Sequence, residues 1–116
     1  MKLTYFDVYG KAEPIRLLLN HAGVEFEDIR LTGAEFGAIK GDKTKLPYGS
    51  LPVLEKDGKV FAQSVSILRF LGATHGYYPE DAEQRYQVDQ LIDLIEDYSK
   101  PIVAIRFNSK LSDEEK

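Results

Sequence analysis

The chain has 116 residues, of which 43% are hydrophobic and 29% charged, and its net charge is −4. This balance is typical of an ordinary globular protein and excludes a disordered chain, while no apolar run approaches the roughly 20 residues that a membrane span needs. Interleaved charges offer no patch for nucleic acid, and zero cysteines with two histidines exclude a disulfide framework and an ordinary zinc site, so we expect no bound metal. The N-terminus also lacks the continuous apolar stretch of a signal peptide, so we expect a cytoplasmic protein.

The first half of the chain predicts two strands and two helices. Residues 2–6 combine β-branched and aromatic side chains, as a strand does. A helix should follow, because Pro14 suits a first helical turn and Gly23 a helix end. Residues 26–31 alternate well enough for a second strand, and the glycines after them leave room only for a short helix around residues 34–40. The first helix has apolar residues at helical spacing: Ile15, Leu18, Leu19 and Ala22.

A hairpin and a further helix are predicted next. Residues 51–55 and 59–62 flank an Asp57-Gly58 pair, which is a strong hairpin signal. The helix is predicted from about Ser64 to Gly76. The resulting order mixes a βαβ unit with an antiparallel pair on one sheet, which is the order of the thioredoxin fold. A Rossmann unit fits worse, because no G-x-G-x-x-G follows the first strand.

The character of the chain changes after Pro79. A long helix is predicted there, with an apolar stripe and a kink at Pro101. Residues 112–115 have the pattern of a capping box, which predicts another helix. We therefore expect an α/β protein in which a thioredoxin-like βαβ-ββα domain, residues 1–79, precedes the beginning of an all-helical domain, residues 80–116, that has been cut off. The stripe, which would form an exposed patch able to drive association, consists of Val88, Leu91, Ile92, Ile95, Tyr98, Ile102 and Ile105.

Several segments match one family in order along nearly the whole chain. They are LTYFDVYGKAEPIRLLL, then Phe36 with Lys40, then LPYGSLPVLEKDG, AQSVSILRFL and VDQLIDLIEDY. The chain resembles the sigma-class glutathione transferases, the group that includes glutathione-requiring prostaglandin D synthase and nematode enzymes. The resemblance implies glutathione as co-substrate, no metal, a homodimer, and truncation after the first helix of the C-terminal domain.

Tyr5 is the catalytic residue that this resemblance implies. A hydroxyl at the end of the first strand can donate a hydrogen bond to a bound sulfur, which favours the thiolate of a thiol whose free pKa is about 8.5. Alternatively, Tyr5 is merely an aromatic residue of the strand. Lys11 occupies the place of the family's usual arginine, and its ammonium cannot reproduce a guanidinium fork; it is otherwise a solvated loop charge. Arg16 is expected to be a structural ion-pair partner.

Four further residues are implied to hold the peptide of glutathione. The resemblance implies a cis bond between Leu51 and Pro52, which presents the Leu51 backbone to glutathione like an added strand. The alternative is a trans proline at a strand start. Ser64 at a helix N-terminus favours the γ-glutamyl carboxylate, and Gln63 would contact the same end of the ligand. Ser64 as a simple N-cap is the alternative, compatible reading.

The remaining candidates lie on the irregular segment and on the long helix. Phe36 and Lys40 fall where the family places a tryptophan and a lysine at the glycyl end of glutathione, and Phe36 lacks the indole N–H donor. An aspartate matching Asp97 reaches across the family's dimer interface to the partner's glutathione amine. The alternative is that Asp97 belongs to a solvated acidic face on the same helix.

Two functions are compatible with these residues, and a third is excluded. The first is a glutathione transferase that conjugates glutathione to a hydrophobic electrophile in detoxification, or uses it in an isomerisation. The second is a non-catalytic glutathione-binding or structural module, because the helical domain is incomplete. A thioredoxin or glutaredoxin is excluded, because these enzymes need a protein cysteine after the first strand and this chain has none.

Overall fold

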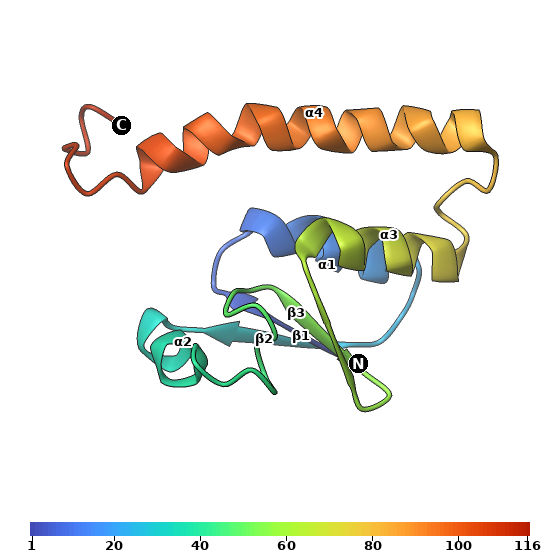
Figure 1. Ribbon diagram of the computed structural model, residues 1–116, viewed down its shortest axis with the longest axis horizontal. Coiled ribbons are helices and arrows are strands. Elements are labelled where there is room, and N and C mark those ends of the chain that lie inside the picture. The colour runs from blue at the N-terminus through green and yellow to red at the C-terminus, as the bar shows by residue number, and fades with distance from the viewer. The chain divides into compact units, whose positions relative to one another are not determined.

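The computed structural model describes residues 1–116 and contains the expected strands and helices in the expected order (Figure 1). It divides into two units, Met1–Tyr78 and Pro79–Lys116. The elements of the first unit are β1 (Lys2–Phe6), the short 3-10 helix η1 (Gly10–Ala12), α1 (Glu13–His21), β2 (Glu27–Leu31), α2 (Gly33–Ile39), β3 (Val53–Lys56), β4 (Lys59–Ala62) and α3 (Ser64–His75).

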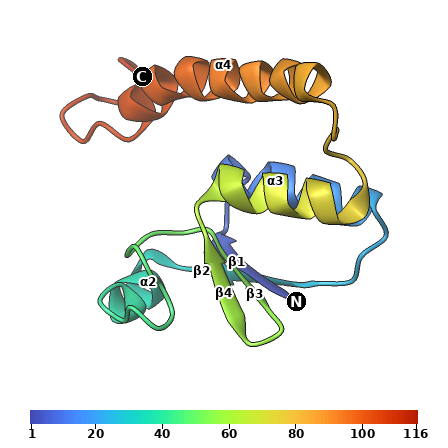
Figure 2. The same ribbon diagram turned by 45° about the vertical axis from the view of Figure 1, so that its right-hand side comes forward.

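The four strands form one mixed sheet in the order β2-β1-β3-β4. β1 pairs in parallel with β2 and antiparallel with β3, and β3 pairs antiparallel with β4. The helices α1 and α3 lie side by side along one face of this sheet, and α2 lies apart from them beyond the carboxyl end of β2 (Figures 1 and 2). The predicted βαβ-ββα arrangement is therefore confirmed.

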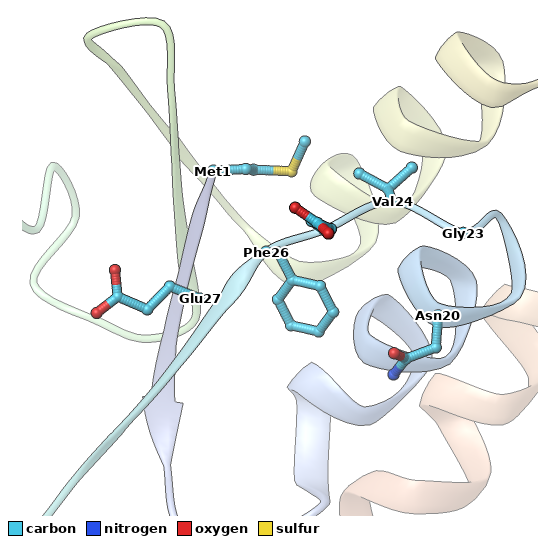
Figure 3. Close-up of a pocket in the computed structure, with 7 residues that line it drawn as sticks. Met1, Asn20, Gly23, Val24, Phe26 and Glu27 are labelled. Atoms are coloured by element: carbon cyan, nitrogen blue, oxygen red, sulfur yellow. The ribbon is translucent and has the colours of Figure 1, made fainter.

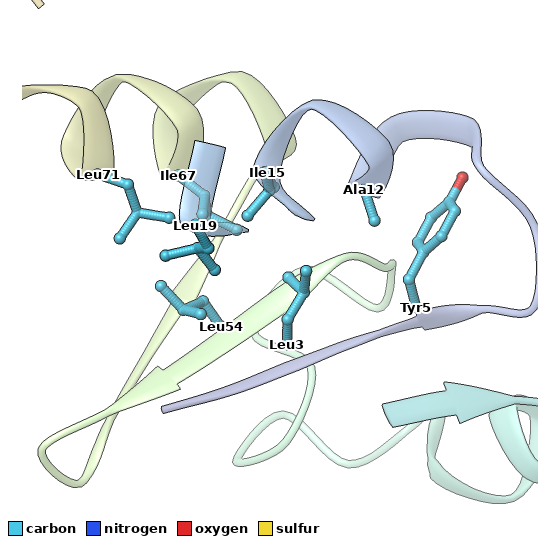
Figure 4. Packing of buried hydrophobic residues seen from close by; sticks show 8 residues of the cluster. All are labelled: Leu3, Tyr5, Ala12, Ile15, Leu19, Leu54, Ile67 and Leu71. Atoms are coloured by element: carbon cyan, nitrogen blue, oxygen red, sulfur yellow. The ribbon is translucent and has the colours of Figure 1, made fainter. Parts of the chain in front are cut away.

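The core of the first unit lies between the sheet and the helices α1 and α3. Leu3 and Tyr5 alternate with the less buried Lys2, Thr4 and Phe6 along β1, so one face of the strand is buried, as the two-residue period of a strand requires. Figure 4 shows these two side chains reaching towards the helices. The cluster they join also contains Ala12, Ile15, Leu19, Leu54, Ile67 and Leu71.

The hairpin turn has the geometry that its sequence predicts. Asp57 and Gly58 both have positive φ, 52° and 73°, which a two-residue type I′ turn needs and which favours the Asp-Gly pair. β3 begins at Val53, two residues later than predicted. Because Pro52 has no N–H to donate to a strand ladder, the regular pairing starts only after it.

The helix predicted from about Ser64 is confirmed, because α3 begins at that residue. Gln63 occupies the N-cap position, so the alternative reading of Ser64 as an N-cap does not hold, and no side-chain hydrogen bond caps the helix. At residues 112–115 the Ser112 N–H donates to the Glu115 carboxylate, but the backbone forms a turn and no helix. A single capping bond does not offset the cost of forming the first helical turn.

The second unit consists of α4 (Ala82–Arg106) and the residues around it. The helix begins at the N-cap Asp81, whose carboxylate accepts from the Gln84 N–H, and continues through Pro101. No residue of α4 is buried. The exposed members of the predicted stripe are Leu91, Ile95, Tyr98, Ile102 and Ile105.

None of the helices in the structure combines the length and the apolar character that crossing a membrane requires.

Candidate functional site

Tyr5 lies next to the end of β1, with its ring in the core and its hydroxyl at the margin of the core. The residue is 8% exposed, and Figure 4 shows the hydroxyl pointing away from the apolar cluster. The hydroxyl oxygen accepts a hydrogen bond from the Lys11 backbone N–H at 3.2 Å. A phenol can accept and also donate, and no acceptor of this chain takes the Tyr5 hydroxyl hydrogen. The Lys11 N–H therefore holds the hydroxyl oxygen in place, and the hydroxyl hydrogen is available for donation to a ligand.

Strand register brings Tyr5 to the same edge of the sheet as two other predicted site residues. Thr4 pairs with Val53, and Val53 pairs with Ala62. One step along each strand from these partners come Tyr5, Pro52 and Gln63. The Leu51–Pro52 peptide bond is cis, as expected. The ends of β1 and β4 and the beginning of β3 therefore lie next to one another.

Gln63 has an unusual backbone conformation that the sequence did not reveal. Its φ is 73° and its ψ is 111°, although it is neither glycine nor asparagine. Such a conformation is sparsely populated by residues with a side chain, and it persists only where the surroundings impose it, often at functional sites. No local sequence pattern marks it, because glutamine is an ordinary helix-compatible residue.

The loop after β1 closes tightly over Tyr5 at Gly10. Gly10 has a φ of +43°, and a Cβ built on it would lie 2.5 Å from the Tyr5 hydroxyl oxygen. Both the conformation and the contact therefore require glycine. The chain turns here into η1, which carries the Lys11 N–H to Tyr5.

Arg16 holds this loop from inside. It is 3% exposed, and its guanidinium donates from Nη1 to the Val8 and Tyr9 carbonyl oxygens at 2.8 and 3.4 Å. Nη2 donates to the Phe6 carbonyl oxygen at 3.4 Å. Arg16 also makes the ion pairs expected of it, with Glu13 at 3.1 Å and Asp28 at 3.2 Å. Its spacing of four residues from the buried Ala12 was the one signal that this arginine faces inward.

A second arginine holds the same loop from outside. Arg30 pairs with Asp7 at 2.8 Å and with Asp28 at 3.1 Å. The hydrogen bonds that Arg30 donates to Asp7 and then to Asp28 raise its pKa above the ordinary value, so Arg30 stays charged at every physiological pH. The loop is therefore fastened to β2 and α1 by alternating charges.

Comparison with known proteins matches this unit to one family. The model of the glutathione S-transferase N-terminal domain matches residues 1–73. The chain belongs to the glutathione S-transferase family. Glutathione S-transferase 1 of Ascaris suum is 44% identical over 97 residues, which cover 84% of this chain and 46% of that protein. Hematopoietic prostaglandin D synthase of Gallus gallus is 38% identical over 97 residues, covering 84% of this chain and 47% of that protein.

A solved glutathione S-transferase has the same fold. The crystal structure of the enzyme from Ascaris lumbricoides superposes with a TM-score of 0.83 at 39% identity, covering 99% of this chain and 56% of that one. The thioredoxin-like fold and the resemblance to nematode and prostaglandin D synthase relatives are thereby confirmed. The chain spans about half the length of the relatives it matches.

Two predicted glutathione contacts of this transferase domain lie on and beside α2. The Phe36 ring meets the Phe6 ring edge to face, with centroids 5.1 Å apart, and Phe6 in turn lies 5.5 Å from the Tyr5 ring. The Lys40 ammonium lies 5.8 Å from the centroid of the Phe36 ring. A continuous series of rings therefore links α2 to β1.

Other predicted contacts are not joined to Tyr5 by their side chains. Lys11 is exposed, and it is the backbone N–H, not the ammonium, that reaches the Tyr5 hydroxyl. Asp97 is exposed on α4, in the second unit. Ser64 is half-buried at the start of α3, one residue beyond Gln63.

The hollows of the transferase domain lie at the other edge of the sheet. A wide hollow of about 670 Å³ is bordered by Met1 and by residues 20 and 23–27, and Figure 3 shows Met1 and Phe26 there. A smaller one lies beside Met1, Lys2 and the hairpin. Met1, which borders both hollows, lies before the start of β1, whereas Tyr5 lies near the end of that strand. Tyr5 therefore lines neither hollow.

Acid should loosen α2. The Glu35 carboxylate accepts from the Thr32 backbone N–H at 3.0 Å, and this bond, with that of the Thr32 hydroxyl, lowers the pKa of Glu35 below its ordinary value of 4.5. A lowered folded pKa stabilises the helix fully above pH 4.5, and this stabilisation is lost as the pH falls through the folded pKa.

Amide exchange of the α2 residues, followed from neutral pH downwards by NMR, measures this effect. Exchange should depart from its intrinsic pH dependence below the ordinary carboxyl range. Glu35→Gln keeps an acceptor for the Thr32 N–H but cannot titrate, so its α2 should show no such departure. Identical profiles for the two proteins would show that Glu35 is not responsible.

Proposed function

We propose that this chain binds glutathione at the edge of the sheet where β1 ends and stabilises the glutathione thiolate through the Tyr5 hydroxyl. The observation that carries the proposal is the hydroxyl itself: it is fixed by the Lys11 N–H and retains a free hydrogen. A donor held in place before the ligand arrives pays no ordering cost when the charge forms.

The proposed chemistry is one proton transfer followed by one displacement. The thiol of glutathione loses its proton to water, and the remaining sulfur anion accepts the hydrogen bond from Tyr5. The sulfur then forms a bond to the electrophilic carbon of a hydrophobic substrate, and the leaving group departs with its electron pair. An isomerisation that uses and regenerates glutathione is an alternative use of the same anion. Detoxification in the cytoplasm is the setting we propose, because conjugation removes reactive electrophiles.

The peptide part of glutathione is proposed to lie across the strand ends. The Leu51 backbone before Pro52 would pair with the cysteinyl unit, while Gln63 and Ser64 at the start of α3 would receive the γ-glutamyl end. The free N–H groups of a helix N-terminus favour that carboxylate.

The glycyl end of glutathione is proposed to lie near α2 and the residue that follows it. Both belong to residues 1–79, the proposed glutathione-binding domain. Lys40 and Phe36 would lie near the glycyl carboxylate, with the ammonium supplying the opposite charge. Lys11 would add a further positive charge near the sulfur. Asp97, in the helical residues 80–116, would reach the ligand amine of a partner subunit.

Ultraviolet difference spectroscopy tests the proposal directly. Mixing the chain with glutathione near neutral pH should produce thiolate absorbance, because the bound thiol ionises below its free pKa of about 8.5. S-methylglutathione is the matched control, since it has the same peptide but no ionisable sulfur. Binding of both ligands with no thiolate signal from either would contradict the role of Tyr5.

We also consider a second function, because the chain spans only 46% and 47% of two relatives that it matches. A non-catalytic glutathione-binding or structural module would bind glutathione without turning over an electrophile. Turnover of a chromogenic electrophile well above the rate in buffer would exclude this function.

We also propose that the chain forms a homodimer through α4. The exposed fractions of Ile95 and Tyr98 on this helix are 61% and 72%, and a second copy of the same face would remove them from water. Sedimentation at micromolar concentration should give a dimer, which Ile95→Lys should dissociate. Gln90→Lys, at a polar position of the same helix, should remain dimeric. A monomer for the unaltered chain would reject the proposal.

A further inference from the structure

We propose that Arg16 is a positioning residue for the Tyr5 hydroxyl. Its catalytic consequence rests on the proposed function, but the positioning itself concerns only the protein. The guanidinium binds the carbonyl oxygens of Phe6, Val8 and Tyr9, which follow Tyr5 directly in the chain. The same loop then delivers the Lys11 N–H to the Tyr5 oxygen.

The partners of Arg16 fall into two groups with different consequences. The carboxylates of Glu13 and Asp28 neutralise its charge and connect α1 with β2. The carbonyl oxygens of Phe6, Val8 and Tyr9 belong to the end of β1 and to the loop after it, and they carry no net charge. A guanidinium can serve both groups at once because its donors form a rigid planar fork, whereas a lysine ammonium cannot reach the same set.

The loop has little else to fix its inner side. Val8 and Tyr9 are 50% and 75% exposed, so their side chains add little packing. The backbone of residues 7–9 also makes a short turn, from the Val8 N–H to the Phe6 carbonyl oxygen at 2.8 Å, and accepts one bond, from the Glu13 N–H to the Tyr9 carbonyl oxygen at 3.0 Å. The guanidinium also lies 5.9 Å from the centroid of the Tyr5 ring. Arg16 therefore contacts both the ring to be positioned and the loop that positions its oxygen.

A purely structural role would make a different prediction. If Arg16 served only to join α1 to β2, removing the charge of Asp28, its partner on β2, would have the same effect on the loop as changing Arg16 itself. Asp28→Asn removes the charge of the partner and leaves the three carbonyl contacts in place. Arg16→Lys keeps the positive charge and removes the fork. The two variants therefore separate the two roles.

The first measurement is amide hydrogen exchange at Lys11 without glutathione. Exchange should be at least about tenfold faster in Arg16→Lys than in the unaltered chain, the effect expected for loss of hydrogen bonds from a charged donor. In Asp28→Asn the Lys11 rate should stay within about threefold, given the partly exposed position of that ion pair. Equal Lys11 rates in the two variants would overturn the proposal.

A measurement on the unaltered chain covers the case in which Arg16→Lys does not fold. Exchange of the Lys11 amide and of the Arg16 Nη2 hydrogens, which bind the Phe6 carbonyl oxygen, is followed at rising denaturant concentration. If Arg16 positions the loop, these hydrogens and the Lys11 amide should be released by the same opening, with the same free energy and denaturant dependence. Release of Lys11 in a lower-energy opening that leaves the Arg16 Nη2 hydrogens protected would overturn the proposal.

The catalytic consequence is measured separately with glutathione bound. The pKa of the bound thiol should rise by about one unit in Arg16→Lys and stay unchanged in Asp28→Asn, because only the former displaces the donor. An unchanged thiol pKa in a folded Arg16→Lys protein would overturn this consequence. Absence of any thiolate in the unaltered chain would instead overturn the proposed function, while the Lys11 exchange result would still decide the positioning.

Discussion

Replacing Tyr5 by phenylalanine is expected to lower kcat/KM for glutathione conjugation by on the order of 10²-fold, the usual effect of removing one preorganised donor to a reacting anion. The ring remains, so the apolar cluster around Leu3 and Ile15 keeps its packing. Only the hydroxyl is lost, and with it the acceptor of the Lys11 N–H. The pKa of bound glutathione should therefore return towards that of the free thiol.

Steady-state kinetics with a chromogenic electrophile, together with pH titration of the bound thiol, measures this effect. The affinity for S-methylglutathione should change little, because that ligand offers no anion to stabilise. This control separates loss of thiolate stabilisation from loss of binding. Equal thiol pKa values in Tyr5→Phe and the unaltered chain would remove Tyr5 from the mechanism.

Gly10→Ala is expected to destabilise the domain by about 2–5 kcal/mol and to weaken thiolate formation at the same time. A residue with a side chain strains the backbone at a φ of +43°, and the added methyl would lie 2.5 Å from the Tyr5 hydroxyl oxygen. These two effects contribute roughly 1–2 and 1–3 kcal/mol, respectively. Because the obstruction meets the hydroxyl directly, relief requires movement of Tyr5 or of the loop.

Urea denaturation and the glutathione difference spectrum measure the two consequences of this substitution. Gly37→Ala is the matched control for stability, since Gly37 lies inside α2 with no atom near the position of an added Cβ. There the same chemical change should stabilise the chain by up to about 1 kcal/mol, because alanine favours a helix over glycine. If the Gly10→Ala protein is as stable as the unaltered chain, the loop accommodates the added methyl group without strain, and the prediction is wrong.

Local sequence patterns predicted most of the fold because the relevant signals are short. The Asp57-Gly58 pair alone fixes the hairpin, and the alternation of Leu3 and Tyr5 identifies the buried face of β1. At residues 112–115 the capping-box bond forms without a helix, because one such bond does not offset the cost of the first helical turn. The predicted site depended on resemblance, and strand register now accounts for the proximity of Tyr5, Pro52 and Gln63.

The features that sequence reasoning missed depend on contacts between distant segments. The role of Arg16 requires the loop carbonyls to turn inwards, which no spacing of side chains encodes. The close approach of Gly10 to Tyr5 likewise depends on the path of the loop. The backbone of Gln63 is set by the junction between β4 and α3, where the direction of the chain changes.

The position of β2 at the margin of the sheet has a consequence for solubility. This strand pairs on one side only, with β1, so its other side presents unpaired backbone groups that could recruit a strand from another molecule. Glu27, Asp28 and Arg30 occupy three of its five positions, and charged side chains discourage such recruitment. Exchanging the Asp28 and Arg30 pair for apolar residues would thus remove a barrier to aggregation as well as the fastening of the loop.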